Sequence, residues 1–183
     1  MGAGIANFLG GTTIVSGSEL DHGQARGGKG NSASGTGALF AGLGAGGGIF
    51  NFLGNYNSSV FGQLNPSVVT VTKSTLDHNL AQGGGGGNGL GGGIANLLSA
   101  TTTVDSSFLT NNQANGGGGA GLGGGAYNDA SSSLTLTNCL VTLNQANGSP
   151  GIGGGVFNLG LFSHPGSLII FNHASTSGDN IGP

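Results

Sequence analysis

Apolar and polar residues alternate along several short stretches of this chain. A single Val separates two Thr in the segment Thr70–Thr72, and Leu takes the place of Val in Thr135–Thr137. A strand with one buried face has this two-residue period, because successive side chains point to opposite faces of the sheet. No segment has a convincing helical period, and clusters of Gly interrupt each candidate helix. The pattern predicts short strands joined by tight turns, with the Gly-rich segments 83–87 and 116–119 as loops between repeats.

These strands belong to a repeat. A Gly-rich phrase that ends in Asn occurs five times, first as Gly-Ala-Gly-Ile-Ala-Asn at residues 2–7 and next as Gly-Gly-Gly-Ile-Phe-Asn at residues 46–51. The unit is about 30 residues long in the later copies. The first copies are longer, and we place loop insertions at about 26–45 and 52–66. We expect residues 1–183 to form a single repeat domain that is a piece of a longer protein, since the chain begins inside a repeat.

Repetition along the whole chain indicates a solenoid, in which each unit stacks on its neighbours. Parallel strands of neighbouring coils then lie ~4.8 Å apart. We therefore predict an all-β fold, a right-handed parallel β-helix (β-solenoid) of about five coils with Gly-rich loops. We expect one apolar column of Ile5, Ile49, Ile94, Ala126 and Val156, and a second of Val15, Val71, Val104 and Leu136.

Asn residues recur at two positions of the unit. The Gly-rich phrase ends in Asn7, Asn51, Asn96, Asn128 and Asn158. A second column consists of Asn79, Asn112, Asn144 and Asn172, with Gly23 at this place in the first copy. We interpret both columns as structural, because stacked amides hydrogen-bond from coil to coil. Asn and Gly also tolerate the left-handed backbone angles of tight turns.

A second phrase, an apolar residue followed three positions later by Asn, accompanies the Gly-rich phrase at residues 76–79, 108–111, 141–144 and 169–172. Together the two phrases resemble the repeats of chlamydial polymorphic outer-membrane proteins. They are similar as well to the wider group of right-handed parallel β-helix repeat proteins, which are pectate-lyase-like in fold. The resemblance implies secretion or display at the cell surface. Its members include adhesins, autotransporter passengers and polysaccharide enzymes, so it leaves the function open.

Composition restricts the partners. Three Lys and Arg and a formal net charge of −3 argue against nucleic acid. No run approaches the ~18 apolar residues of a membrane helix, so we expect no transmembrane segment in this chain. Met1 is followed at once by repeat sequence, and no signal peptide is predicted. Cys139 lies in a strand-like run and is expected in the core.

The phrase Leu-Asp-His occurs twice, and the repeat places the two copies in neighbouring coils. Asp21 should lie near Asp77, and His22 near His78. Two close carboxylates could share a proton, and with two His they could bind a metal or act as acid and base. Strand alternation, however, would send Asp and His to opposite faces. We keep the four residues as catalytic candidates beside the interpretation that they are ordinary surface residues, and we expect neither a metal nor a cofactor.

Polysaccharide lyases of this fold use clustered acidic residues, usually with calcium and a basic residue. Asp105 could extend a ladder of Asp21 and Asp77, and Lys73 is the nearest basic candidate. In the Gly-rich phrase, the residue just before the final Asn is aromatic in three of the five copies. These aromatic residues could offer contacts to a sugar, or they could form a second packing layer. These ligand-binding candidates are Phe50, Tyr127 and Phe157.

Thr residues flank the inward column at Thr70, Thr72, Thr103, Thr135 and Thr137, and this arrangement resembles the Thr ladder of an ice-binding face. Ile14, Ser16 and Asp105 interrupt the ladder.

Our leading hypothesis is a secreted or cell-surface structural or adhesive module without catalytic activity. Its partner would be a glycan or a cell-surface or matrix ligand. The alternative is a carbohydrate-active enzyme, either a polysaccharide lyase or a glycoside hydrolase, or a glycan-binding module. An ice-binding module is the third hypothesis.

Overall fold

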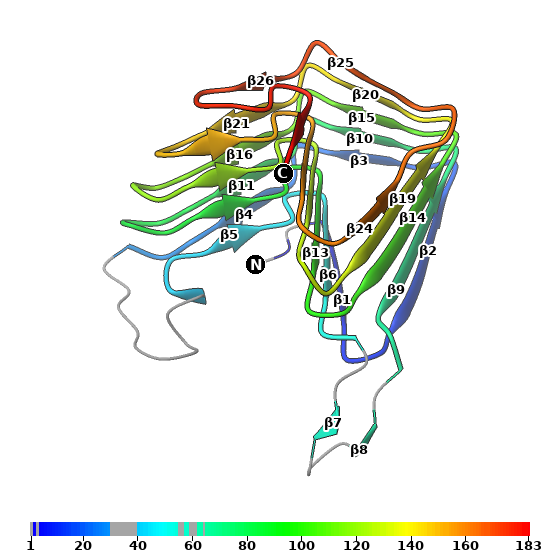
Figure 1. The fold of residues 1–183 in the computed structure, drawn as a ribbon. Coiled ribbons are helices and arrows are strands. Elements are labelled where there is room, and N and C mark those ends of the chain that lie inside the picture. The colour runs from blue at the N-terminus through cyan, green and yellow to red at the C-terminus, as the bar shows by residue number, and fades with distance from the viewer. Residues whose placement is uncertain (1, 3, 30–39, 55–56, 59–61, 64) are drawn as a thin grey trace.

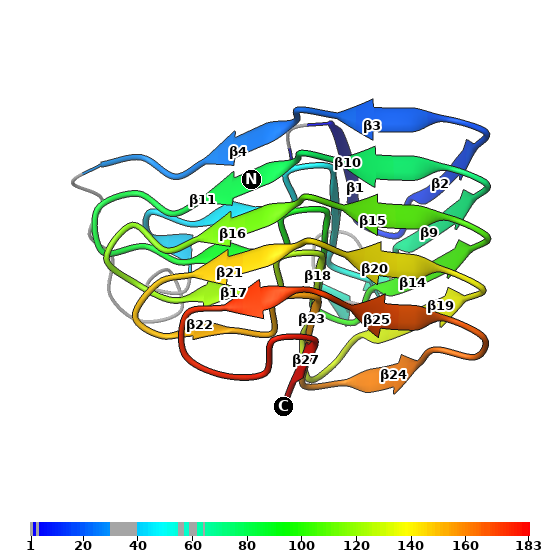
Figure 2. The same ribbon diagram turned by 90° about the horizontal axis from the view of Figure 1, so that it is seen from above.

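The computed structural model describes residues 2, 4–29, 40–54, 57–58, 62–63 and 65–183. These residues wind into a right-handed parallel β-solenoid of about five coils, stacked along one axis (Figures 1 and 2). The fold predicted from the repeat is therefore confirmed. Within the described ranges, no helix is long and apolar enough to cross a membrane.

Five parallel sheets, named A to E in the order in which the chain visits them, make up the solenoid. Sheets A, B and C enclose a triangular section (Figure 1). Sheet A consists of β1 (Ile5–Phe8), β6 (Ile49–Phe52), β13 (Ile94–Leu97), β18 (Ala126–Asn128), β23 (Val156–Asn158) and β27 (Ile181–Gly182). Sheet B consists of β2 (Thr12–Ser16), β9 (Val68–Thr72), β14 (Thr101–Asp105), β19 (Ser133–Thr137) and β24 (Leu161–Ser163). Sheet C consists of β3 (Glu19–Asp21), β10 (Thr75–Asp77), β15 (Phe108–Thr110), β20 (Leu140–Thr142) and β25 (Leu168–Ile170).

Sheets D and E form an arm that extends from the triangle (Figure 1). Sheet D consists of β4 (Gln24–Arg26), β11 (Leu80–Gln82), β16 (Gln113–Asn115), β21 (Gln145–Asn147) and β26 (His173–Ala174). Sheet E consists of β5 (Gly44–Ala45), β12 (Gly89–Leu90), β17 (Gly121–Leu122) and β22 (Gly151–Ile152). After sheet E the chain returns to sheet A and begins the next coil.

The main core fills the triangle between sheets A, B and C. Alternate side chains of each strand point inward, as the two-residue period predicts. Val71 pairs in register with Val15 and Val104, and Ile49 pairs with Ile5 and Ile94. Both predicted apolar columns are thus present. Cys139 belongs to the same core, as expected, and its Sγ lies 3.2 Å from the carbonyl oxygen of Thr137.

Two ladders of Asn side chains run along the axis. In the first, Nδ2 of Asn7 donates to Oδ1 of Asn51 over 2.9 Å, and Asn51 donates to Asn96 over 3.1 Å. The same bonds continue through Asn128 to Asn158. The second ladder contains Asn79, Asn112, Asn144 and Asn172. Each amide joins one coil to the next, so both ladders fix the stacking register.

The left-handed backbone angles do not fall on the ladder residues, and that part of the sequence interpretation is wrong. One set of them falls on the residue just before the second ladder, at the corner between sheets C and D. Its φ lies between 49° and 59° in His22, His78, Asn111, Leu143 and Phe171. The ladder Asn must point its amide inward, so its neighbour makes the turn.

The arm is thin because sheets D and E pack through Ala and Gly. Sheet D contributes Ala25, Ala81, Ala114 and Ala146, which are buried, and they face Gly44, Gly89, Gly121 and Gly151 of sheet E. A Cβ at Gly89 would overlap the carbonyl oxygens of Ala81 and Asn115. Only Gly permits so close an approach of two backbones. This packing explains why Gly recurs once in each coil of sheet E.

The two insertions expected at about 26–45 and 52–66 lie partly outside the described residues. In the second, β7 (Asn57–Ser58) and β8 (Gly62–Gln63) form an antiparallel pair away from the solenoid (Figure 1). In the first, Phe40 lies near Phe52 of sheet A, with ring centroids 5.7 Å apart.

Candidate functional site on the outer face of sheet C

Two outward columns of side chains cover sheet C, and their chemistry changes along the axis. One column begins at Glu19 and Thr75 and continues with Phe108, Leu140 and Leu168. The other column contains Asp21, Asp77, Thr110, Thr142 and Ile170. The face is therefore acidic in the first coils and apolar in the last.

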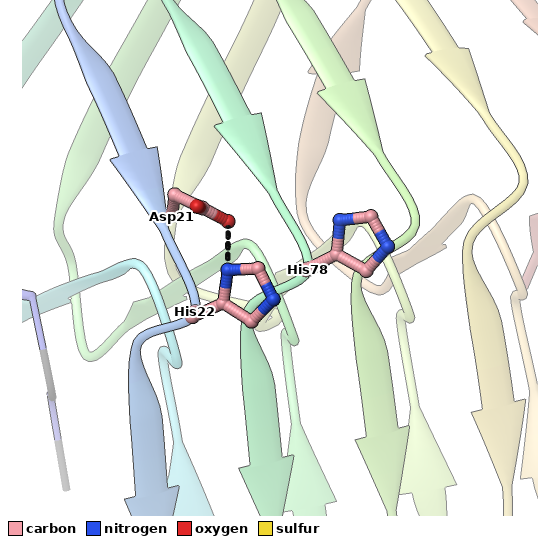
Figure 3. Close-up of side chains that lie close together, drawn as sticks. All are labelled: Asp21, His22 and His78. Atoms are coloured by element: carbon pink, nitrogen blue, oxygen red, sulfur yellow. Dashed lines mark ion pairs between the residues drawn. The ribbon is translucent and has the colours of Figure 1, made fainter.

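The acidic end holds two Asp–His pairs in adjacent coils. Asp21 and Asp77 are register partners, and Figure 3 shows His22 and His78 projecting side by side from the same corner. The two imidazole rings are stacked, with centroids 5.1 Å apart and planes 3° from parallel. The argument that alternation would separate Asp from His is wrong, because φ values of 53° and 49° at the two His turn their side chains outward.

Each His ring contacts the carboxylate that precedes it. His22 Nδ1 pairs with Asp21 Oδ1, as Figure 3 shows, and His78 Nδ1 lies 2.6 Å from Asp77 Oδ2. A neutral imidazole that donates from Nδ1 keeps a lone pair on Nε2. Both rings are well exposed, with side-chain exposures of 70% for His22 and 50% for His78. Their Nε2 atoms are thus available to a ligand.

Asp77 is the most constrained of the four residues. Its Oδ1 accepts hydrogen bonds from Thr110 Oγ1 at 2.6 Å and from Asn111 Nδ2 at 2.9 Å. Burial by itself raises the pKa of Asp77, but these bonds and the neighbouring His78 outweigh burial and lower the pKa to about 2. Asp77 is consequently ionised at neutral pH. It suits the role of an orienting carboxylate, and so low a pKa suits neither a general base nor a general acid at neutral pH.

The acidic ladder expected from Asp21, Asp77 and Asp105 does not form. Asp105 belongs to β14 of sheet B, where it pairs in register with Thr72 and Thr137. Lys73 occupies the corner between β9 and β10, with φ 48°. The Thr column of the ice-binding hypothesis is present in register on sheet B as Thr70, Thr103 and Thr135. That hypothesis stays a prediction.

The aromatic ligand-binding candidates lie in a second core between sheets A and E. Phe50 is buried in this core, and Phe157 is buried beside it. Tyr127 is partly buried and stacks on Phe157, with centroids 5.4 Å apart. Burial and the charge of Asp129 raise the pKa of Tyr127. Tyr127 also lines a hollow of about 180 Å³, whereas Phe50 packs among other Phe rings.

The exposed aromatic residues are different ones, which the sequence reasoning missed. At the apolar end of the sheet C face, the exposed fractions are 50% for Phe108, 54% for Leu143, 60% for Leu168 and 75% for Phe171. We call these four residues the apolar patch. Leu143 and Phe171 also line a hollow of about 300 Å³ together with His173. Aligning the repeats would have shown Phe108 in the column of Thr75 and Phe171 in the column of His78.

Comparison with known proteins finds no matching family model, no matching curated protein and no matching solved structure.

Proposed function

We propose that this chain is a secreted or cell-surface structural module that adheres to a partner without chemical turnover. Its contact surface is the outer face of sheet C, and its partner is a cell-surface or matrix component or a glycan. The observation that carries the proposal is the apolar patch. Soluble proteins leave few large apolar side chains exposed next to one another, and such patches are typical of interaction surfaces.

The geometry of the patch supports this role. Phe108 and Leu168 belong to one column, two coils apart, so they lie ~10 Å from each other along the axis. Leu143 and Phe171 lie three residues further along the chain than Leu140 and Leu168, at the corner between sheets C and D, and the column of Thr110, Thr142 and Ile170 lies between. The two ladders of buried amides hold these coils in register, so the patch is rigid before it binds. A rigid surface loses little conformational entropy on binding.

The resemblance to autotransporter passengers also supports a surface-exposed adhesive module. Those proteins display long β-helices outside the cell, and the present chain has the architecture. The resemblance rests on the two sequence phrases.

The test is binding of the purified, untagged chain to cells, matrix proteins and a glycan array. We expect binding that the double substitution Phe108→Ser with Phe171→Ser weakens at least 10-fold. Leu161→Ser is the matched control, because Leu161 is 71% exposed but lies on sheet B. Equal loss in the control, or no binding to any surface, would reject the proposal.

A glycan ligand is favoured by a separate observation at the tip of the arm. A hollow of about 470 Å³ is lined by Arg26 and Lys29, two of the three basic residues of the chain, and by the Gly83–Gly85 backbone. Cationic groups beside exposed backbone suit an acidic sugar, whose carboxylate and hydroxyl groups need both charge and hydrogen-bond partners. A uronate oligosaccharide is therefore the second candidate ligand.

This candidate is tested with oligogalacturonate and alginate oligomers. Binding that Arg26→Gln abolishes, with no product released, identifies a glycan-binding module. Release of product that Asp77→Asn abolishes identifies a carbohydrate-active enzyme instead. Binding unaffected by Arg26→Gln would exclude the arm as the glycan site.

A further inference from the structure

The acidic end of sheet C gathers metal-binding atoms from two coils. One ligand atom from each of Asp21, His22 and His78 lies within 4.8 Å of the other two. Asp21 and His22 come from the first coil, and His78 comes from the second (Figure 3). His22 and His78 are 56 positions apart in sequence and meet because β3 and β10 pair in register.

We propose that Asp21, His22 and His78 bind one divalent transition-metal ion, of which Zn²⁺ is the best-fitting class, while Asp77 holds His78 in position. Two imidazoles and one carboxylate form a donor set typical of zinc. Imidazole nitrogen favours zinc, copper or nickel over calcium and magnesium, which prefer oxygen ligands. A water molecule completes the tetrahedral shell.

The hydrogen bond between His78 and Asp77 is the arrangement that metal-bound His residues usually have. A carboxylate that accepts the Nδ1 proton fixes the ring orientation and raises the basicity of Nε2. Because Thr110 and Asn111 already donate to Asp77, its carboxylate is held in place while no ion is bound. His78 therefore binds through Nε2, and Asp77 is a positioning residue.

Small side-chain movements bring the ligands to bonding distance. Zinc–nitrogen bonds of ~2.0–2.1 Å require donor atoms roughly 3.5 Å apart. One ligand atom of each residue lies within 4.8 Å of the other two, and all three residues are exposed. Rotations about the side-chain bonds, including one that moves the Asp21 carboxylate away from His22 Nδ1, close the difference. The backbone does not need to move, because the left-handed corner already directs both rings outward.

Metal binding would join the first coil to the second. The ion would connect β3 with β10 at the corner between sheets C and D. Since the unfolded chain keeps these residues far apart, the ion binds the folded state preferentially and stabilises it by mass action.

The experiment titrates the untagged chain with ZnCl₂ by calorimetry and with CoCl₂ by visible absorption. We expect one ion per chain and a thermal unfolding midpoint that rises with zinc concentration. His22→Asn and His78→Asn should each weaken zinc binding at least 10-fold. Asn already occupies this corner in the next coil as Asn111, with φ 52°, so these variants should fold normally.

His173→Asn is the matched control, because His173 also lies near a carboxylate, with its Nδ1 3.6 Å from Asp179 Oδ1, but it has no second pair beside it in the described chain. It should bind zinc like the wild type. Asp77→Asn should weaken binding about 10-fold while keeping one ion per chain. No binding at 1:1 stoichiometry, or equal binding by His22→Asn and His78→Asn, would overturn the proposal.

Discussion

Asn112 and Asn144 are stacked one coil apart, and Asn112 donates from Nδ2 to Oδ1 of Asn144 over 3.0 Å. Asn112 also donates to the carbonyl oxygen of Leu76, and its Oδ1 accepts from both the backbone and the side chain of Asn79. Both side chains are fully buried. Every polar atom of Asn112 therefore has a partner that water cannot replace.

We predict that Asn112→Ala destabilises the chain by about 3 kcal/mol or more, because it leaves several buried donors and acceptors without partners, each costing ~1–3 kcal/mol. Asn115→Ala is the control, since Asn115 is only partly buried and should cost less than about 1 kcal/mol. Urea unfolding followed by circular dichroism measures both. Similar losses in the two variants would mean that the ladder contributes no special stability.

Gly89 tests the close packing of the arm. Gly89→Ala places a methyl group against the carbonyl oxygens of Ala81 and Asn115, so we expect a loss of several kcal/mol or failure to fold. Gly86→Ala is the control, because a Cβ at Gly86 meets nothing within 4 Å and only its φ of 74° opposes the change. We expect that control to cost about 1 kcal/mol. The thermal unfolding midpoints compare the two, and a mild effect of Gly89→Ala would show that the sheets of the arm can separate.

The register of the solenoid could be predicted from the sequence because equivalent residues of successive repeats stack on one another. Ile49 and Ile94 hold the same place in two copies, so stacking alone makes them neighbours. The direction of a side chain at a corner could not be predicted in this way. After Gly, Asn is the residue type that most readily takes left-handed angles. His78 takes them in place of Asn79, because Asn79 must point inward to reach Asn112.

The burial of the aromatic residues could not be predicted from the sequence either. Phe50 follows an inward-facing Ile and should face outward, which it does. It is nevertheless buried, because sheet E folds back over the outer face of sheet A. Strand periodicity describes the two faces of one sheet, and it contains no information on which other sheet covers a face. Aligning the repeats places Phe108 and Phe171 in outward columns, but the alignment does not show that these columns stay uncovered.

Cys139 offers a test of core burial. Burial raises the pKa of its thiol above the usual value, and its Sγ lies near the carbonyl oxygens of Val104 and Thr137. A thiol reagent at pH 8 should therefore react with Cys139 slowly in the folded chain and rapidly in 8 M urea. Equally rapid reaction without urea would show that the core opens locally around β20.

Asp77 contributes to the stability of the chain in a way that depends on pH. Its pKa is about 2 in the folded state and has the ordinary value of 3.8 in the unfolded chain. A folded-state pKa below the unfolded one means that the ionised carboxylate stabilises the fold. This contribution is fully present above about pH 4 and is lost as the pH falls from about 4 toward 2.

Thr110→Val removes one of the hydrogen bonds that lower this pKa, so it should destabilise the chain by on the order of 1 kcal/mol at pH 7. The difference from the wild type should shrink as the pH approaches 2, because the protonated carboxyl no longer depends on Thr110. Thr142→Val is the control, since Thr142 follows Thr110 in the same outward column but faces no carboxylate in its register partners. Its effect should not vary with pH. Urea unfolding at pH 7, 4 and 2.5 measures all three proteins, and a pH-independent effect of Thr110→Val would contradict the role of its hydroxyl group in holding Asp77 ionised.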